Sequence, residues 1–144
     1  MKRDYRILSL DDIKELIEFW QASGLSYRPY GRDTYSNIAK QMKLSSTKFY
    51  GRFIDNKLIA TAIASHNGRK GWINRLAVHP DFQHQGIASD LIIFCENWLH
   101  KNGIDIFAVL IENDNQASMD LFKKNKYIKH TDIIYYTKRK HDKV

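Results

Sequence analysis

The sequence has little cysteine and no long apolar run, and each shortage excludes a class of protein. Its 144 residues include one cysteine, Cys95, which excludes an internal disulfide framework and a zinc site built from several thiolates of one chain. The six histidines show no metal-ligand spacing, so we expect no metal. No apolar run approaches the roughly 20 residues of a membrane helix, and no apolar stretch follows the basic N-terminus as in a signal peptide. We expect one domain over residues 1–144 of a cytoplasmic protein, either a monomer or a homodimer.

Acidic residues are also fewer than basic ones, which favours partners with negative charge. The chain has 23 Lys and Arg against 16 Asp and Glu, a formal net charge of +7. This balance suits a nucleic acid, an acidic surface or a phosphate-rich cofactor. Part of the excess lies in residues 138–143, a pattern typical of a solvated chain end. Because no recognition helix or aromatic ribonucleoprotein pattern accompanies the charge, a basic nucleic-acid-binding protein is the least favoured of three candidate functions.

Hydrophobic periodicity and turn residues predict an α/β (α+β) fold. Ser9 and Asp33 are candidate N-caps of two helices, and Gly24 ends the first of them. The order β-α-α-β-β-β-α-β-α-β predicts a mixed central sheet flanked by helices on both faces. A right-handed crossover makes the fourth and fifth strands parallel neighbours or near neighbours. We expect the strands over residues 5–8, 49–54, 58–64, 72–78, 104–111 and 133–138, and the last two helices over residues 86–100 and 115–124.

The most informative segment is a strand that ends in a loop from which a helix begins. It reads Leu76-Ala77-Val78-His79-Pro80, followed after two residues by Gln83-His84-Gln85-Gly86-Ile87-Ala88. The first backbone N–H groups of a helix have no helical partner and the helix dipole adds positive potential, so such a position favours a phosphate. The small residues at its fourth and sixth positions let a phosphate approach the backbone closely. An ordinary helix N-terminus is the alternative interpretation of the loop taken by itself.

This segment closely resembles the acetyl-CoA signature of the GNAT superfamily of N-acetyltransferases. In that family a strand of the pattern L-A-V-x-P precedes a Q/R-x-x-G-x-G/A loop and a long amphipathic helix. A second family element follows about one strand later, with Asn115, Ser118, Phe122 and Tyr127. The resemblance covers essentially the whole chain and implies a GNAT-like, mostly antiparallel sheet. It also implies an enzyme that moves the acetyl group of acetyl-CoA to a primary amine of a small molecule, an amino acid, or a peptide or protein, by direct attack in a ternary complex. The alternative is a catalytically weak acyl-CoA-binding sensor of the same fold.

The resemblance implies a coenzyme A site on these elements. The strand backbone would hydrogen-bond the pantetheine arm like an added strand, and a bulge would aim a free N–H at the thioester carbonyl. The loop would hold the pyrophosphate, Asn115 would contact the pantetheine, and Phe122 would pack near the thioester sulfur. Lys124, or its neighbour Lys123, would meet the adenosine phosphates. The implied cofactor-binding residues are Leu76, Ala77, Val78, Gln83, His84, Gln85, Gly86, Ile87, Ala88, Ser89, Asn115, Ser118, Phe122 and Lys124.

Two positions differ from the residues to which family members assign acid–base roles. The frequent tyrosine, a proposed proton donor to the CoA thiolate, is Phe122 here, and a strand glutamate is replaced by Asn74. A thiol has a pKa of ~8.5, so the thiolate can leave without a donor. The remaining candidates for the base are Glu112, His66 and Tyr135, each of which has a structural alternative as a strand-end, turn or strand residue. We expect Glu112, Asn74 and Tyr135 to carry the acid–base chemistry, with Glu112 preferred as the base.

The irregular stretch between the first two helices lies where GNAT folds build the acceptor pocket. Its aromatic residues and arginines, Tyr27, Arg28, Tyr30 and Arg32, predict a site for an acidic or carboxylate-bearing amine. The alternative is a surface loop in which an arginine pairs with Asp33. Cys95 falls on the apolar stripe of the long helix, which predicts a core residue and not a nucleophile.

Overall fold

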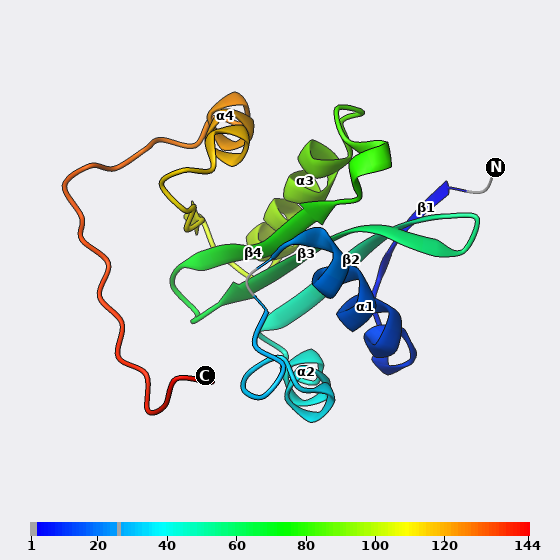
Figure 1. Ribbon diagram of the computed structural model, residues 1–144. Helices are drawn as coiled ribbons and strands as arrows, with labels where there is room; N and C mark the ends of the chain where they lie inside the picture. Colours follow the sequence, from blue (N-terminus) through cyan, green and yellow to red (C-terminus); the bar gives the residue numbers. More distant parts are fainter. Residues whose placement is uncertain (1–2, 26) are drawn as a thin grey trace.

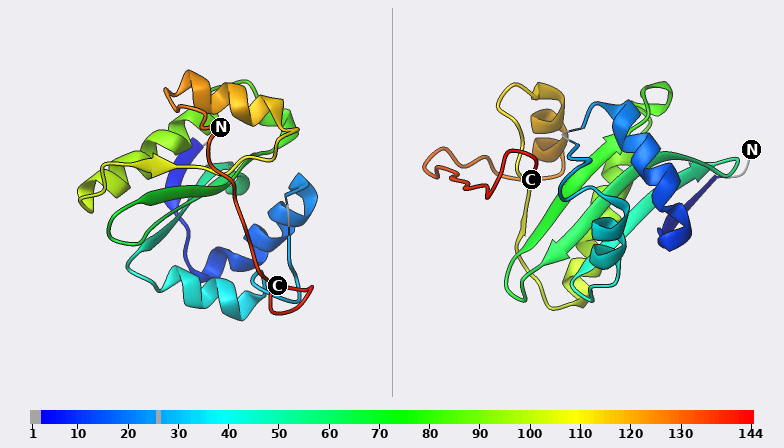
Figure 2. Two further views of the ribbon diagram at one scale, coloured as in Figure 1. Left: turned by 90° about the vertical axis from the view of Figure 1, so that its left-hand side faces the viewer. Right: turned by 60° about the horizontal axis from the view of Figure 1, so that its bottom comes forward.

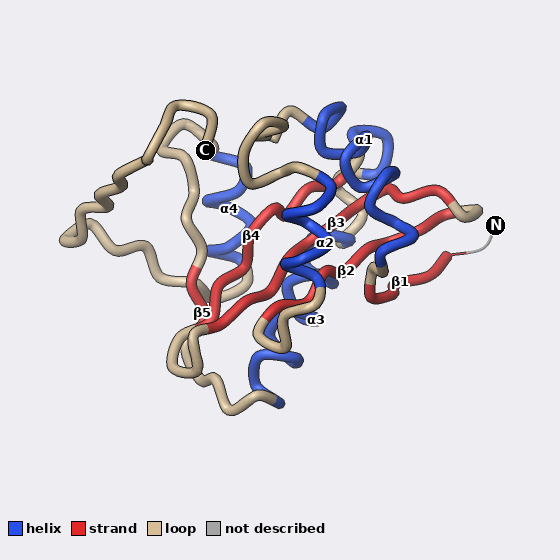
Figure 3. The backbone as a smooth tube through the Cα atoms, turned by 90° about the horizontal axis from the view of Figure 1, so that it is seen from below, coloured by secondary structure: helices blue, strands red, loops and turns tan. Residues whose placement is uncertain are grey.

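The computed structural model describes residues 3–25 and 27–144. Five strands form one sheet in the order β1-β2-β3-β4-β5 (Figure 1; β5 is labelled in Figure 3). Neighbouring strands are antiparallel except β4 and β5, which are parallel. The predicted mixed, mostly antiparallel sheet and the parallel pairing across the crossover are therefore confirmed. The strands are β1 (Arg3–Ile7), β2 (Thr47–Ile54), β3 (Lys57–His66), β4 (Gly71–Val78) and β5 (Phe107–Ala108).

Helices cover both faces of this sheet (Figure 2). Helices α1 (Ile13–Ser23) and α2 (Tyr35–Met42) lie on one face, which we call the α1–α2 face. Helices α3 (Ile87–Lys101) and α4 (Gln116–Lys124) lie on the other. The core is correspondingly divided into two layers, with Trp20 and Ile38 packed against the first face and Leu91 and Phe122 against the second. Cys95 is buried in the second layer, as predicted.

Turn and capping residues set several element boundaries. The two residues that join β2 to β3, Asp55 and Asn56, have φ angles of 51° and 65°, the backbone of a tight two-residue hairpin. Helix α1 ends at Gly24, whose φ of 77° is left-handed, as predicted. Before α1, the 3-10 turn η1 (Leu10–Asp12) begins after Ser9, and the backbone N–H of Ser9 donates to the Asp12 carboxylate at 2.8 Å.

The prediction that Asp33 caps the second helix is wrong. The N-cap of α2 is Thr34, whose hydroxyl oxygen accepts a hydrogen bond from the backbone N–H of Asn37 at 3.2 Å. Asp33 is buried instead and accepts hydrogen bonds from the backbone N–H of Arg28 and from the guanidinium of Arg75. A buried carboxylate is stable when a cation pairs with it, and β4 supplies that cation.

The C-terminal part of the chain departs furthest from the prediction. The strand predicted over residues 104–111 is reduced to β5, and residues 133–138 form no strand at all. Residues 128–140 are exposed; Tyr136, for example, is 86% exposed. From α4 the chain runs past the sheet and ends next to the loop that precedes α2 (Figures 1 and 3), where Arg28 Nη1 donates to the carbonyl of Asp142. Alternating apolar residues become a strand only when another strand offers a hydrogen-bonding edge, and these residues pair with none.

Candidate active site

Strand β4 contains a bulge at Arg75. Asn74 pairs with Ile63 and Ala77 pairs with Thr61, which leaves two residues of β4 opposite one residue of β3. Arg75 has a φ of 54°, in the left-handed region that a non-glycine residue adopts at a cost. The buried hydroxyl of Thr61 donates a hydrogen bond to the carbonyl oxygen of Arg75 at 3.2 Å. A bulge is thus present in the strand in which the family resemblance implies one.

The bulge places two consecutive side chains on the same face of the sheet. Ile73, Leu76 and Val78 pack toward α3 and α4, whereas both Asn74 and Arg75 border a cavity of about 910 Å³ on the α1–α2 face. The cavity lies between β4, the segment before α2 and the C-terminal residues. Its lining comprises Trp20, Tyr30, Gly31, Arg32, Asp33, Thr34, Asn37, Gln41, Ile63, Asn74, Arg75, Leu110, Tyr135, His141 and Val144.

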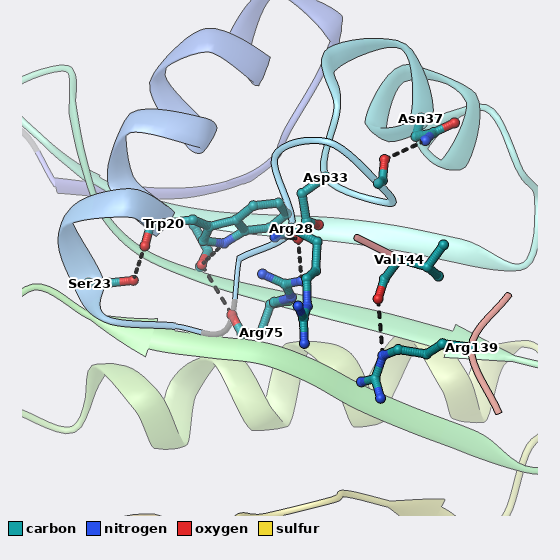
Figure 4. A network of polar contacts seen from close by, with 10 residues as sticks. Trp20, Ser23, Arg28, Asp33, Asn37, Arg75, Arg139 and Val144 are labelled. Carbon is teal, nitrogen blue, oxygen red and sulfur yellow. Dashed lines mark hydrogen bonds and ion pairs between the residues drawn. The ribbon is translucent and has the colours of Figure 1, made fainter. Parts of the chain in front are cut away.

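An ion pair forms part of this cavity wall (Figure 4). Arg75 Nη2 donates to Asp33 Oδ2 at 2.8 Å, and the backbone N–H of Arg28 donates to the same oxygen at 2.6 Å. The Arg75 guanidinium also lies over the indole ring of Trp20, 4.8 Å from its centroid. Arg75 Nη1 is buried and has no hydrogen-bond partner within residues 3–25 and 27–144. The guanidinium is therefore held in place, with one of its nitrogens buried and unpaired among the described residues.

The backbone edge of β4 that faces β5 is open beyond the first residues of the strand. The pairing with β5 involves only Gly71 and Trp72 of β4. Among the described residues no strand pairs with this edge farther along, where Leu76 and Ala77 lie. An extended ligand can hydrogen-bond to such an edge like an added strand. The carbonyl of Val78, at the end of the strand, accepts a hydrogen bond from Gln83 Nε2 at 3.1 Å.

The loop that follows β4 leads directly to the N-terminus of α3. After the 3-10 turn η2 (Pro80–Phe82), His84 and Gly86 adopt left-handed φ angles of 62° and 83°. Gly86 is the N-cap of α3, a helix of 15 residues, and residues 83–86 are exposed. The N-terminal end of a helix this long carries unpaired N–H groups and partial positive charge, so this loop can bind a phosphate group.

The second family element surrounds α4. Asn115 is the N-cap of α4, and its side-chain oxygen accepts a hydrogen bond from the backbone N–H of Ser118 at 3.1 Å. Phe122 is 4% exposed and lies edge-on to Tyr127, with ring centroids 4.9 Å apart. Lys124 is exposed at the end of the helix. In addition, Asn125 Nδ2 donates to Ser89 Oγ at 3.2 Å, which connects α4 to the start of α3.

The structure brings some of the predicted catalytic residues together and leaves others apart. Asn74 and Tyr135 both border the cavity. Glu112 is exposed on the loop after β5 and does not line the cavity, although Leu110 on the same loop does. His66 lies at the end of β3, where its Nδ1 accepts a hydrogen bond from the backbone N–H of Gly68 at 3.0 Å. The environment of His66 is that of a turn residue.

The predicted acceptor residues are divided in a similar way. Tyr30 and Arg32 line the cavity, whereas Tyr27 packs against the core of the α1–α2 face. The side chain of Arg28 donates from Nη1 to the backbone carbonyl of Asp142 at 3.4 Å. The C-terminal residues therefore lie next to the acceptor segment at the border of the cavity.

Sequence reasoning missed the ion pair of Asp33 and Arg75 together with its support from Trp20 and Thr61. The two charged residues are 42 positions apart, and no local pattern connects them. The available signal was an arginine between the apolar residues Ile73 and Val78, because a charged residue in an apolar strand needs a buried partner or a function. That signal points to Arg75 but does not identify its partner.

Two other types of site receive no support. Burial raises the pKa of the Cys95 thiol to about 12, so this cysteine is protonated at neutral pH and does not act as a nucleophile. Across the described part of the chain, no group of three or more His, Cys, Asp or Glu side chains is arranged to hold a metal ion. No helix found in residues 3–25 and 27–144 has the length and apolar character needed to cross a membrane.

Three features together are typical of an acyltransferase fold: the open, bulged strand β4, the loop that leads to α3, and the adjoining cavity. Comparison with known proteins identifies the family. The profile of the acetyltransferase (GNAT) family matches residues 13–127. The chain belongs to this family and is an acetyl-CoA-dependent acyltransferase. It is 27% identical over 124 residues to an acetyltransferase of Pectobacterium atrosepticum, covering 86% of each chain. It is 25% identical over 136 residues to an acetyltransferase of Sodalis glossinidius, covering 94% of each chain.

Solved structures share the fold at lower sequence identity. An aminoglycoside acetyltransferase, AAC(6′)-Iy, crystallised with a bisubstrate analogue of coenzyme A, superposes with a TM-score of 0.80 at 17% identity, over 96% of this chain and 99% of that one. The PaiA N-acetyltransferase from Thermoplasma acidophilum, crystallised with coenzyme A, gives a TM-score of 0.74 at 22% identity, over 87% and 89%. These similarities establish the fold, whereas the acceptor has to be argued from this chain's own cavity.

Proposed function

We propose that the protein is an N-acetyltransferase that moves the acetyl group of acetyl-CoA to the primary amine of a small molecule, an amino acid, or a peptide or protein. The observation that carries the proposal is the position of the bulge in β4. On one side the strand presents an open backbone edge that leads to the loop of residues 83–88, and on the other it borders the cavity. A donor along the edge and an acceptor in the cavity would meet at the bulge, which suits direct attack in a ternary complex.

The residues for the donor are those of the edge, the loop and α4. The backbone of Leu76 and Ala77 would bind the extended pantetheine arm, and N–H groups at the start of α3 would bind the pyrophosphate. Gly86 has a left-handed φ, and apart from its chain neighbours no atom of the described residues lies within 4 Å of the position that a Cβ would take. The approach to those N–H groups is therefore open. Lys124 is exposed at the surface and would contact the adenosine phosphates.

The acceptor amine has to lose a proton, because an alkylammonium with a pKa of ~10 is no nucleophile. Asn74 borders the cavity and would orient a water molecule toward the amine. We retain Glu112 as the proposed final proton acceptor, since its loop borders the cavity through Leu110. Tyr135, which lines the cavity, is the competing candidate. The thiolate would leave without a dedicated donor, because Phe122 has no proton to give and a thiol pKa of ~8.5 permits it.

A second candidate function, within the same family, is that of a catalytically weak member that serves mainly as an acyl-CoA-binding sensor. It is favoured by Asn74 and Phe122, which stand where relatives are expected to carry an ionisable side chain. Both candidates would bind the donor at the same edge and loop, so binding alone does not separate them. With either function, we propose a single-domain protein. We place it in the cytoplasm, because its one cysteine is buried and free, which suits a reducing compartment.

The proposal is tested by a screen of amines with acetyl-CoA, in which release of CoA and the mass of the acetylated product are both measured. An enzyme releases CoA in step with an acetylated amine. A sensor binds acetyl-CoA but releases no more CoA with any amine than without one. Absence of both binding and release would contradict the proposal.

A further inference from the structure

The cavity on the α1–α2 face contains an arginine that is only partly used by the protein. Arg75 is 15% exposed as a side chain and its Nη2 is bonded to Asp33 at 2.8 Å. Its Nη1 is buried and has no partner among residues 3–25 and 27–144, and the same is true of Nε of Arg28. A buried charged donor without an acceptor is costly, so an anionic ligand oxygen at this point would be strongly favoured.

The charge of the cavity wall favours an anion over a cation. Among the described residues, the charged side chains of the lining are two arginines, Arg32 and Arg75, and one carboxylate, that of Asp33. The backbone carboxyl of Val144 also lies in the lining, where it accepts a hydrogen bond from Arg139 Nε at 3.0 Å. One oxygen of the Asp33 carboxylate already accepts two hydrogen bonds, from the Arg28 backbone and from Arg75. An acceptor with several ammonium groups would therefore find an opposing charge that is already paired, and it would meet two arginines.

The geometry of Arg75 is suited to recognising a planar group. The ring of Trp20 lies 4.8 Å from the guanidinium and the Asp33 pair fixes one of its nitrogens, so the plane of the guanidinium is held before any ligand binds. Arg75 is also adjacent in sequence to Leu76, where the proposed donor edge begins. An anion at Nη1 would thus lie close to the bulge at which the acetyl group is transferred.

From these observations we infer that Arg75 recognises a carboxylate of the acceptor, so that the acceptor class is an amine with a carboxylate a few bonds away, such as an amino acid. The inference rests on the proposed acetyltransferase function and narrows its substrate class. In the reaction the amine nitrogen bonds to the acetyl carbonyl carbon, the carbon–sulfur bond of the thioester breaks, and the amine proton passes to water or the base. Arg75 takes no part in these steps and positions the acceptor through the carboxylate.

The test uses matched pairs of acceptors, namely α-, β- and γ-amino acids and the corresponding carboxamides, each supplied at an equal concentration of neutral amine. We expect each amino acid to have a kcat/KM at least ~10-fold higher than that of its carboxamide. One charge-assisted hydrogen bond contributes enough free energy for a ratio of this size. In Arg75→Lys, which keeps the charge but loses the planar pair of nitrogens, this ratio should fall several-fold. In Arg69→Lys, a matched change at an exposed arginine of the β3–β4 turn, the ratio should keep its wild-type value.

A double variant keeps the test decisive if the charge of Arg75 is needed for folding. Arg75→Gln combined with Asp33→Asn removes both charges at once and leaves no carboxylate unpaired, and melting curves confirm that it is folded. The ratio should fall to about 1 in this variant. A wild-type ratio near 1, or a ratio unchanged in the folded double variant, overturns the inference and leaves the proposed function intact. If the wild type acetylates no member of either set but acetylates another amine of the wider screen, the inference fails and the proposed function stands. If it acetylates no amine at all, the proposed function fails and the inference fails with it.

Discussion

The hydroxyl of Thr61 connects three elements around the bulge. It donates a hydrogen bond to the carbonyl oxygen of Arg75 at 3.2 Å and accepts one from the indole N–H of Trp20 at 3.4 Å. Thr61 is 1% exposed, so both contacts are shielded from water. A single buried hydroxyl on β3 thereby bonds to both α1 and the bulge of β4.

Replacing this hydroxyl should loosen the bulge. We expect Thr61→Val to lower the free energy of unfolding by about 1–3 kcal/mol, because the indole N–H and the carbonyl lose their buried partner. The kcat of acetyl transfer should fall more than the affinity for acetyl-CoA, if the bulge positions the thioester as we propose. Thr61→Ser, which keeps the hydroxyl, is the control and should retain most of the activity. Equal stability of the valine variant and the wild type in urea unfolding would contradict this account.

The loop before α3 gives a matched pair of glycine substitutions. Gly86 and Gly103 both have left-handed φ angles, 83° and 78°. At either position, apart from the chain neighbours, no atom in the described part of the chain lies within 4 Å of an added Cβ. Gly86→Glu and Gly103→Glu therefore carry similar backbone strain. We expect only Gly86→Glu to abolish binding of acetyl-CoA in isothermal titration, because its carboxylate repels the pyrophosphate. Comparable losses in both variants would show that strain, and not charge at the loop, is responsible.

The identity of the base is tested at Glu112. General acid–base groups contribute typically ~10²–10⁴-fold, so Glu112→Gln should lower kcat at least ~100-fold while the Kd for acetyl-CoA stays nearly the same. Asp114→Asn, at an exposed carboxylate of the same loop, should have little effect. If Glu112→Gln keeps nearly full activity and Tyr135→Phe abolishes it, the role belongs to Tyr135, the residue that borders the cavity.

A pH dependence of stability follows from the turn before α1. The hydrogen-bonded guanidinium of Arg6, together with the N–H of Ser9, lowers the pKa of Asp12 below its usual value. The group therefore contributes stability that is fully present above the unfolded pKa of ~3.9 and is lost as the pH falls through the folded pKa. Because Arg6 is partly exposed, solvent screens the pair, and we expect about 1 kcal/mol at neutral pH.

The measurement is urea unfolding of the wild type and of Asp12→Asn between about pH 7 and about pH 3. The two proteins should differ at neutral pH and converge as the pH drops below ~4. Asp11→Asn, at an exposed carboxylate of the same turn, should follow the wild type throughout. A difference between wild type and Asp12→Asn that persists unchanged at the lowest pH would contradict the assignment.

Local sequence patterns predicted a helix end or a turn correctly where the residues that determine it are close together in the chain. Gly24 ends α1, Asp55 and Asn56 form the hairpin turn, and Gly86 opens α3, as their intrinsic backbone preferences require. The strand and loop that we propose for the donor were predicted for the same reason, since they form one continuous motif.

Signals that depend on distant partners were missed or misinterpreted. The alternating residues 133–138 satisfy the strand pattern, but a strand needs an edge to pair with, and β5 itself pairs through only two residues. Asp33 has the composition of a helix cap, but the guanidinium of Arg75 is a stronger partner for a buried carboxylate than the backbone N–H groups of α2. Neither outcome can be predicted without knowing which segments meet in space.

The central claim, that the β4 edge and the loop of residues 83–88 bind acetyl-CoA, is tested most directly by thermal unfolding of the wild-type protein with and without millimolar acetyl-CoA. A ligand at ~100 times its Kd adds ~2.7 kcal/mol to the stability of the folded state. For a chain of this length the melting temperature should therefore rise by roughly 10 °C. Melting curves that coincide with and without acetyl-CoA would contradict the account.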